Sequence, residues 1–101
     1  MPGERIKQMI TRIITNHVKE GHKEAYIAVS KAFISELIQY CGCVSGGIYE
    51  VQGSDRDVIN IETWPDRETA DAVTGTEVFR KYVPELIPHF EGNETLVLIE
   101  R

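Results

Sequence analysis

The chain has 101 residues, of which 42% are hydrophobic, 27% charged and 8% aromatic. This composition and length are typical of a single globular domain, here residues 1–101, whose small core often gains stability from a partner. Eleven Lys and Arg against 16 Asp and Glu give a net charge of −5. The chain therefore lacks the basic balance typical of proteins that bind nucleic acid or anionic membranes.

Neither a membrane span nor an export signal is expected. No apolar run approaches the roughly 18 residues that cross a bilayer, and the first five residues lack the layout of a signal peptide. Cys41 and Cys43 are too close in sequence to staple a domain, and His17, His22 and His89 are scattered. We expect a cytoplasmic protein with reduced thiols and no metal site; a redox pair of cysteines is the alternative.

The first half of the chain reads as strand, helix and strand. β-branched residues dominate residues 6–18, which predicts one long strand. Over residues 22–40 the apolar positions recur at steps of three and four, which predicts an amphipathic helix ending near Gly42. A second strand is predicted over residues 43–52, where the Gly46-Gly47 pair indicates a bulge or a close approach by another group.

The second half repeats this order. A polar turn leads to a strand over residues 58–64, and Asp66 is predicted to cap a short helix that ends near Val73. A longer helix starts near Thr76. The last strand is predicted over residues 95–99, where an unbroken run of Leu, Val, Leu and Ile is of the kind found in buried strands.

Two strand–helix–strand units joined by a hairpin predict an α+β fold, the ferredoxin-like βαββαβ arrangement with an antiparallel sheet. Right-handed connections place the first and third strands in the centre and both helices on one face. The other face would lie open although it is rich in aliphatic side chains. We therefore predict a homodimer in which a second copy covers that face by sheet-on-sheet packing.

The third strand carries the most informative polar residues. Asn60, Glu62 and Trp64 alternate with Ile61 and Thr63 and therefore share one face of the sheet. An amide and a large aromatic on one face predict either the lining of a pocket or a core Trp beside a satisfied amide. Glu62 is expected to pair with Arg12 across neighbouring strands, or to act as a general base if burial raises its pKa.

Several segments resemble the antibiotic biosynthesis monooxygenase family, a branch of the dimeric α/β-barrel proteins. They are residues 18–24, 41–45, 49–50 and 62–68, followed by Phe79, Leu86 and Pro88. The resemblance extends over residues 6–100 and implies a dimeric α/β barrel. Members that share this pattern include cofactor-free quinol or anthrone monooxygenases, haem-degrading enzymes, an isomerase and proteins with no assigned activity.

The resemblance implies roles for individual residues. In the cofactor-free members, an Asn and a Trp four residues apart on this strand bind or deprotonate a phenolic substrate, and Asn60 and Trp64 match that pair. Their N–H groups are suitable donors to an oxyanion. Tyr49, Tyr82 and Phe33 are candidates for the walls of the pocket.

The match is incomplete on the helices that follow. The Tyr and Arg that those enzymes also use fall near Ala70 and Pro84, which cannot perform the same chemistry. Arg80 and Tyr82 are the nearby substitutes. His89 is the best histidine candidate for proton transfer, because it lies beside apolar residues near the expected pocket rim.

These features predict a homodimeric monooxygenase that uses no cofactor and acts on a small aromatic or quinone-like ligand. The absence of the usual family His, Tyr and Arg favours one alternative, a non-catalytic dimer that binds a small ligand. Isomerase chemistry on the same scaffold is the other alternative.

Overall fold

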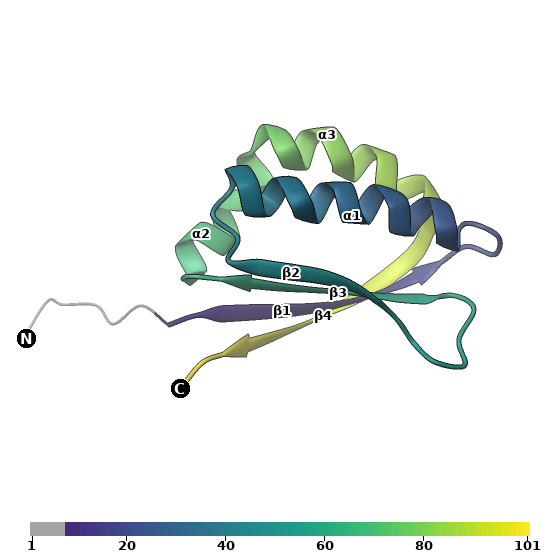
Figure 1. Cartoon of the computed structure of the whole chain (residues 1–101), viewed down its shortest axis with the longest axis horizontal. Coiled ribbons are helices and arrows are strands. Elements are labelled where there is room, and N and C mark those ends of the chain that lie inside the picture. Colours follow the sequence, from purple (N-terminus) through teal and green to yellow (C-terminus); the bar gives the residue numbers. More distant parts are fainter. Residues whose placement is uncertain (1–7) are drawn as a thin grey trace, which may run out of the picture.

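The computed structural model describes residues 8–101, which form a four-stranded antiparallel sheet with helices on one face (Figure 1). The elements in chain order, with η for a 3₁₀ turn, are β1 (Ile10–Val18), α1 (Lys23–Tyr40), β2 (Ser45–Glu50), β3 (Asp57–Trp64), α2 (Arg67–Ala72), η1 (Val73–Gly75), α3 (Glu77–Leu86), η2 (Ile87–His89) and β4 (Phe90–Ile99). The strand order β2-β3-β1-β4 places β1 and β3 in the centre. The predicted ferredoxin-like α+β fold is therefore confirmed.

The ends of the elements follow local chemistry. The Asp66 carboxylate accepts a hydrogen bond from the Thr69 backbone N–H over 2.7 Å, so it caps α2 as predicted. Gly42, which follows α1, has a φ of +81°, the left-handed conformation expected there. β4 begins at Phe90 rather than at residue 95, because its first residues already pair with the end of β1. The first two residues of the strand predicted over 6–18 lie outside the described part of the chain.

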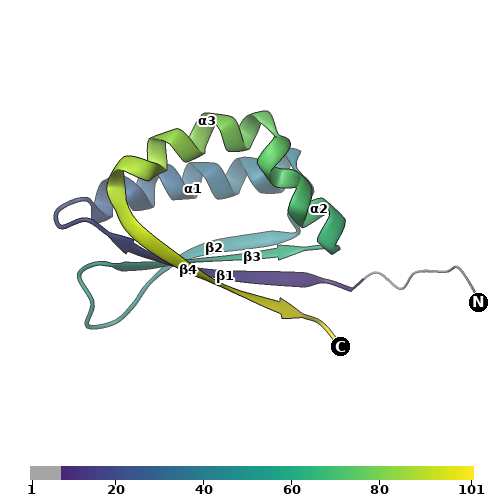
Figure 2. The ribbon, with the colours of Figure 1, turned by 180° about the vertical axis from the view of Figure 1, so that it is seen from behind.

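The helix layer packs closely on β2 and β3, with α3 beside α1 (Figures 1 and 2). A Cβ atom built on Gly46 would lie 2.8 Å from Ile34 Cγ2 of α1, so the close approach predicted there is present. Trp64, Tyr26 and Leu37 are among the fully buried side chains between the helices and the sheet. Within residues 8–101, no helix combines the length and apolar character that crossing a membrane requires.

The other face of the sheet is not covered by the helices. Tyr49, Leu96 and Leu98 lie on this open face. Their cross-strand partners are Ile59, Ile13 and Thr11, and the sequence neighbours of those partners point toward the helices. Their exposed fractions are 53%, 57% and 45%. The expectation that residues 96–99 form a buried strand is wrong for the single chain, because β4 is an edge strand that leaves the helix layer toward its C-terminal end (Figure 2).

Candidate functional site

Residues 8–101 form a partly open cavity of about 230 Å³ between the helix layer and the central strands, here called the helix–sheet cavity. Its aromatic walls are Tyr26 and Phe33 of α1, Phe79 of α3 and Phe90 of β4. Its polar side chains include Arg12, Asn16, Asn60 and Glu62 from the sheet. A mostly apolar cavity with a few convergent polar groups is the usual form of a small-molecule site.

Asn60 faces the helices and lines this cavity. Burial alternates along β3, and Asn60 is on the buried side with only 4% of its surface exposed. Its Oδ1 atom has no hydrogen-bond partner among residues 8–101. A buried polar atom without a partner costs about 1–3 kcal/mol. Asn60 is therefore a cavity-lining residue whose amide oxygen is buried and has no partner among the described residues.

Trp64 shares the face of Asn60 but does not line the cavity. Its side chain is fully buried, and its Nε1–H donates a hydrogen bond of 3.1 Å to Glu62 Oε1. The Arg12 guanidinium carbon lies 5.5 Å from the centre of the indole ring. The indole N–H that sequence reasoning offered to an oxyanion is thus bonded to Glu62. The structure makes Trp64 a core residue that holds this carboxylate in place.

Glu62 is a buried carboxylate in the cavity wall, 4% exposed. Arg12 Nε lies 3.6 Å from Glu62 Oε1, which confirms the predicted ion pair, and Arg12 Nη2 donates to the Ala70 carbonyl over 3.1 Å. Burial raises the pKa of Glu62, and the hydrogen bond from Trp64 and the charge of Arg12 partly offset that rise. The condition for the general-base alternative, a raised pKa through burial, is therefore also met.

Tyr26 is the hydroxyl that lies beside Asn60. Burial raises the pKa of Tyr26 to about 12, although hydrogen bonding with Ser30 and Asn60 opposes the shift. The phenol therefore stays protonated at neutral pH, and it is not a base. Sequence reasoning did not assign Tyr26 to the site; its place among the inward-facing positions of α1 was the available signal.

The two cysteines are both free thiols. Cys43 is buried and its Sγ lies within hydrogen-bonding distance of the carbonyls of Ser45, at 3.3 Å, and Thr63, at 3.4 Å. Burial, and secondly the charge of Glu62, raise the pKa of the Cys43 thiol to about 11. Cys43 is accordingly an unreactive thiol at neutral pH.

Of the other predicted wall and substrate residues on the helices, Phe33 lines the cavity. Tyr82 is not part of the cavity wall; its ring centre lies 5.6 Å from that of Phe33, and its hydroxyl is hydrogen-bonded to Glu36. Arg80 is exposed and donates to the Gly75 carbonyl over 2.8 Å. Neither substitute for the family Tyr and Arg is brought to the cavity.

Tyr49 and His89 also lie elsewhere. The pairing of Tyr49 with Ile59 places the tyrosine on the open face, where its ring covers Gly47. His89 ends η2, and its Nδ1 lies 3.0 Å from His22 Nδ1, outside the cavity wall. Among residues 8–101 there is no group of three or more His, Cys, Asp or Glu side chains arranged to hold a metal ion.

Comparison with known proteins identifies relatives. The sequence model described as antibiotic biosynthesis monooxygenase matches residues 9–85. An uncharacterized protein of Synechocystis sp. is 33% identical over 73 residues, which are 69% of this chain and 50% of that protein. The chain thus spans about half the length of the curated relative that it matches.

Two solved structures show the same fold. A conserved protein from Methanosarcina mazei Go1 superposes with a TM-score of 0.84 at 20% identity, over 94% of this chain and 95% of the other. SnoaB, a cofactor-independent oxygenase from Streptomyces nogalater, superposes with a TM-score of 0.82 at 16% identity, over 93% and 94%. Because the family match covers most of the sequence, the chain belongs to the antibiotic biosynthesis monooxygenase family.

Proposed function

We propose that the chain is a monooxygenase that needs no cofactor and oxidises a small phenolic or quinol-type substrate in the helix–sheet cavity. The observation that supports this most directly is Asn60, which lines an aromatic-walled cavity and whose buried Oδ1 lacks a hydrogen-bond partner within the described chain. The membership of the family and the likeness to a cofactor-independent oxygenase point the same way.

The cavity suits an aromatic substrate. The rings of Phe33, Phe79 and Phe90 enclose a planar ligand, and at about 230 Å³ the space is on the scale of a small aromatic molecule. Asn60 accepts a hydrogen bond from a substrate hydroxyl other than the one that ionises, and so fixes the orientation of the ring. The apolar walls exclude water from the reacting carbon.

The reaction proceeds from the deprotonated substrate. Loss of the hydroxyl proton makes the ring electron-rich, and the ring carbon then transfers electrons to dioxygen. One oxygen atom becomes a carbonyl on that carbon and the other leaves as water. The two hydrogens of the water come from the hydroxyl and the ring carbon, so a phenol plus dioxygen gives a quinone plus water.

We further propose that two copies of the chain pack through their open faces. The apolar side chains of Tyr49, Leu96 and Leu98 are exposed there in the single chain. A second copy would remove them from water, and such self-complementary packing is the usual way in which a two-fold dimer forms.

Oxygen consumption tests the proposed function. The purified protein is mixed with a panel of hydroquinones, naphthols and anthrones, and oxygen uptake is recorded with an electrode. We expect uptake above the rate of autoxidation with at least one compound. Asn60→Ala should lower kcat/KM roughly tenfold or more, because it removes one hydrogen bond to the substrate. Gln39→Ala, the same loss of an amide on the exposed surface of α1, should leave the rate unchanged.

Two other results of these measurements would contradict the proposed function. Saturable binding of these aromatics without oxygen uptake would overturn the proposal in favour of a non-catalytic ligand-binding protein. Oxygen uptake that is unaffected in the Asn60→Ala variant would show that the chemistry takes place outside this cavity.

A further inference from the structure

The cavity wall contains a charged side chain, Glu62, that takes no part in the substrate binding proposed for Asn60. Glu62 lies two residues after Asn60 on the same face of β3 and is 4% exposed. Trp64 Nε1 contacts its Oε1 at 3.1 Å and Arg12 Nε approaches the same atom at 3.6 Å. Both contacts involve Oε1, which leaves Oε2 of the carboxylate for a ligand in the cavity.

A second buried polar atom near Glu62 lacks a partner. Arg12 Nε is buried and makes no hydrogen bond within residues 8–101, because 3.6 Å to Glu62 Oε1 is beyond hydrogen-bonding distance. Asn60 Oδ1 is an acceptor without a partner and Arg12 Nε is a donor without one. The two atoms have opposite hydrogen-bonding character, so a ligand that bonds to both would offer an acceptor to Arg12 and a donor to Asn60.

The strand register sets the backbone spacing of the two residues that carry these atoms. Arg12 pairs with Glu62 and Ile14 pairs with Asn60, so Arg12 and Asn60 are diagonal neighbours across β1 and β3. Backbone positions of such diagonal neighbours are about 7–8 Å apart. Two neighbouring oxygens on one ring, each making a hydrogen bond of about 2.8 Å, span such a distance. A ligand with two vicinal hydroxyls is therefore of the right size to lie between the two residues.

We propose that Glu62 takes the proton from one hydroxyl of a dihydroxyaromatic ligand, that Arg12 holds the anionic oxygen that results, and that Asn60 accepts a hydrogen bond from the second hydroxyl. This inference rests on the proposed function, because it concerns the same cavity. In the transfer the ligand O–H bond breaks, its electron pair stays on the ligand oxygen, and the proton bonds to Glu62 Oε2.

The charges of the site favour this transfer. Before it, the buried positive charge of Arg12 is balanced by Glu62; after it, Arg12 is balanced by the ligand oxygen. No net charge is created in the cavity, so the desolvation cost is small. Burial raises the pKa of Glu62 and so reduces the gap to a phenol, whose pKa is about 10 in water. Trp64, through its bond to Oε1, is a positioning residue for this carboxylate.

Ligand ionisation under argon tests the inference without any oxygen chemistry. 4-Nitrocatechol is titrated into the protein over a range of pH, and the absorbance of its phenolate is recorded. We expect the pKa of the bound ligand to fall by roughly one unit or more relative to free ligand, because Arg12 stabilises the anion. Glu62→Gln and Arg12→Met should each bind the ligand mainly in its neutral form. Glu24→Gln, an exposed change of the same type on α1, should behave as the wild type.

The second hydroxyl has its own readout. 4-Nitrophenol, which lacks it, should bind the wild type roughly tenfold more weakly than 4-nitrocatechol, and Asn60→Ala should remove that difference. If Glu62→Gln does not fold, Glu62→Asp replaces it, and the shorter carboxylate should give a smaller fall in the ligand pKa. The wild-type titration alone also decides the matter, since binding of the neutral phenol only would overturn the proposal.

The two proposals fail separately. Phenolate formation under argon without oxygen uptake in air would keep the role of Glu62 and reject the monooxygenase. Oxygen uptake together with an unchanged phenolate fraction in Glu62→Gln would keep the monooxygenase and reject Glu62 as the proton acceptor. Failure of the wild type to bind 4-nitrocatechol would reject the ligand class.

Discussion

Trp64 donates its indole N–H to Glu62 Oε1 over 3.1 Å, and both side chains are buried on the helix-facing side of β3. A single strand thus supplies a buried carboxylate together with the donor that orients it. Because the two residues are separated by one position, the alternation of the strand keeps them on the same face whatever the surrounding loops do. The energetic value of this contact can be measured directly.

Replacing Trp64 by Phe should destabilise the fold by about 2 kcal/mol, because a buried carboxylate loses a hydrogen-bond donor. The free energy of unfolding is measured by urea denaturation followed by far-UV circular dichroism, since the variant lacks the single Trp of the chain. Tyr40→Phe, at an aromatic that is 66% exposed, is the matched control and should stay near the wild type. Equal stabilities of the two variants would contradict the assigned hydrogen bond.

Arg12→Met should cost at least about 2 kcal/mol, because it leaves the charge of Glu62 buried without its partner. The double variant Arg12→Met/Glu62→Met should be more stable than Arg12→Met alone, since no uncompensated charge remains. Urea denaturation of the wild type, the two single variants and the double variant gives the coupling energy. Additive losses would show that the ion pair across β1 and β3 carries no coupling.

Gly46→Ala should destabilise the protein by about 1–3 kcal/mol, because the added methyl overpacks the contact between β2 and α1. The new Cβ would lie 2.8 Å from Ile34 Cγ2 and 3.3 Å from the Ile61 carbonyl oxygen. Gly75→Ala is the control, since a Cβ there meets no other described atom within 4 Å. Thermal unfolding of both variants compares them, and a loss in Gly75→Ala as large as in Gly46→Ala would refute the packing argument.

Sequence reasoning found the strand faces correctly because they depend only on the period of two. It therefore placed Asn60, Glu62 and Trp64 together and paired Glu62 with Arg12. It did not predict that the Trp64 N–H donates a hydrogen bond to Glu62, because that contact depends on where the carboxylate two residues away is placed. It placed Tyr49 in the pocket, although the register of β2 against β3 puts that residue on the open face.

The helices limited the prediction in a second way. A period of 3.6 shows which residues face inward, but the rotation of each helix decides which of them reach the cavity. Tyr26 and Phe33 of α1 do so, whereas Tyr82 of α3 turns toward Glu36. Leu96 shows a different kind of error. The apolar run to which it belongs predicts burial, but in the single chain this residue is exposed.

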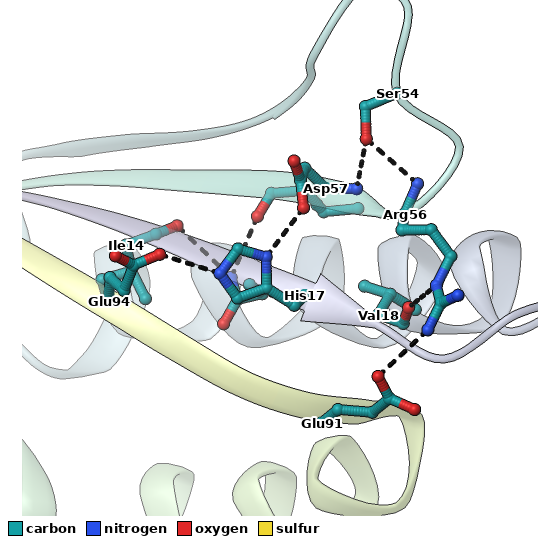
Figure 3. A network of polar contacts seen from close by, with 10 residues as sticks. Ile14, His17, Val18, Ser54, Arg56, Asp57, Glu91 and Glu94 are labelled. Carbon is teal, nitrogen blue, oxygen red and sulfur yellow. Dashed lines mark hydrogen bonds and ion pairs between the residues drawn. The ribbon is translucent and has the colours of Figure 1, made fainter.

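The open face carries a titratable network that predicts a pH dependence of stability. His17 Nδ1 lies 2.8 Å from Asp57 Oδ1 and His17 Nε2 lies 2.8 Å from Glu94 Oε1 (Figure 3). The hydrogen bond to Glu94, followed by that to Asp57, raises the pKa of His17 above 6.5. The folded state therefore binds the proton more tightly than the unfolded state. The stabilisation is fully present below pH 6.5 and is lost as the pH rises through the raised pKa.

Urea midpoints measured between about pH 5 and pH 9 test this dependence. The wild type should lose stability relative to His17→Gln as the pH rises, and the difference should be greatest at the acidic end of the range. Salt at about 1 M, where the Debye length is about 3 Å, should reduce the difference, because all three side chains are partly exposed. A wild-type advantage that is constant with pH would show that His17 does not titrate in this network.

The apolar open face predicts an association that one substitution should break. Leu98 is 45% exposed at the centre of the run from Leu96 to Ile99, and in a dimer it would be buried against the second copy. Leu98→Lys places a charge there, so we expect the dimer to dissociate into folded monomers, as measured by light scattering at micromolar concentration. Ile38→Lys makes the same change on α1, where the apolar side chain is 41% exposed on the helix layer, and should remain dimeric. A wild type that is monomeric at micromolar concentration would contradict the dimer outright. Dissociation of both variants would place the interface on the helices as well.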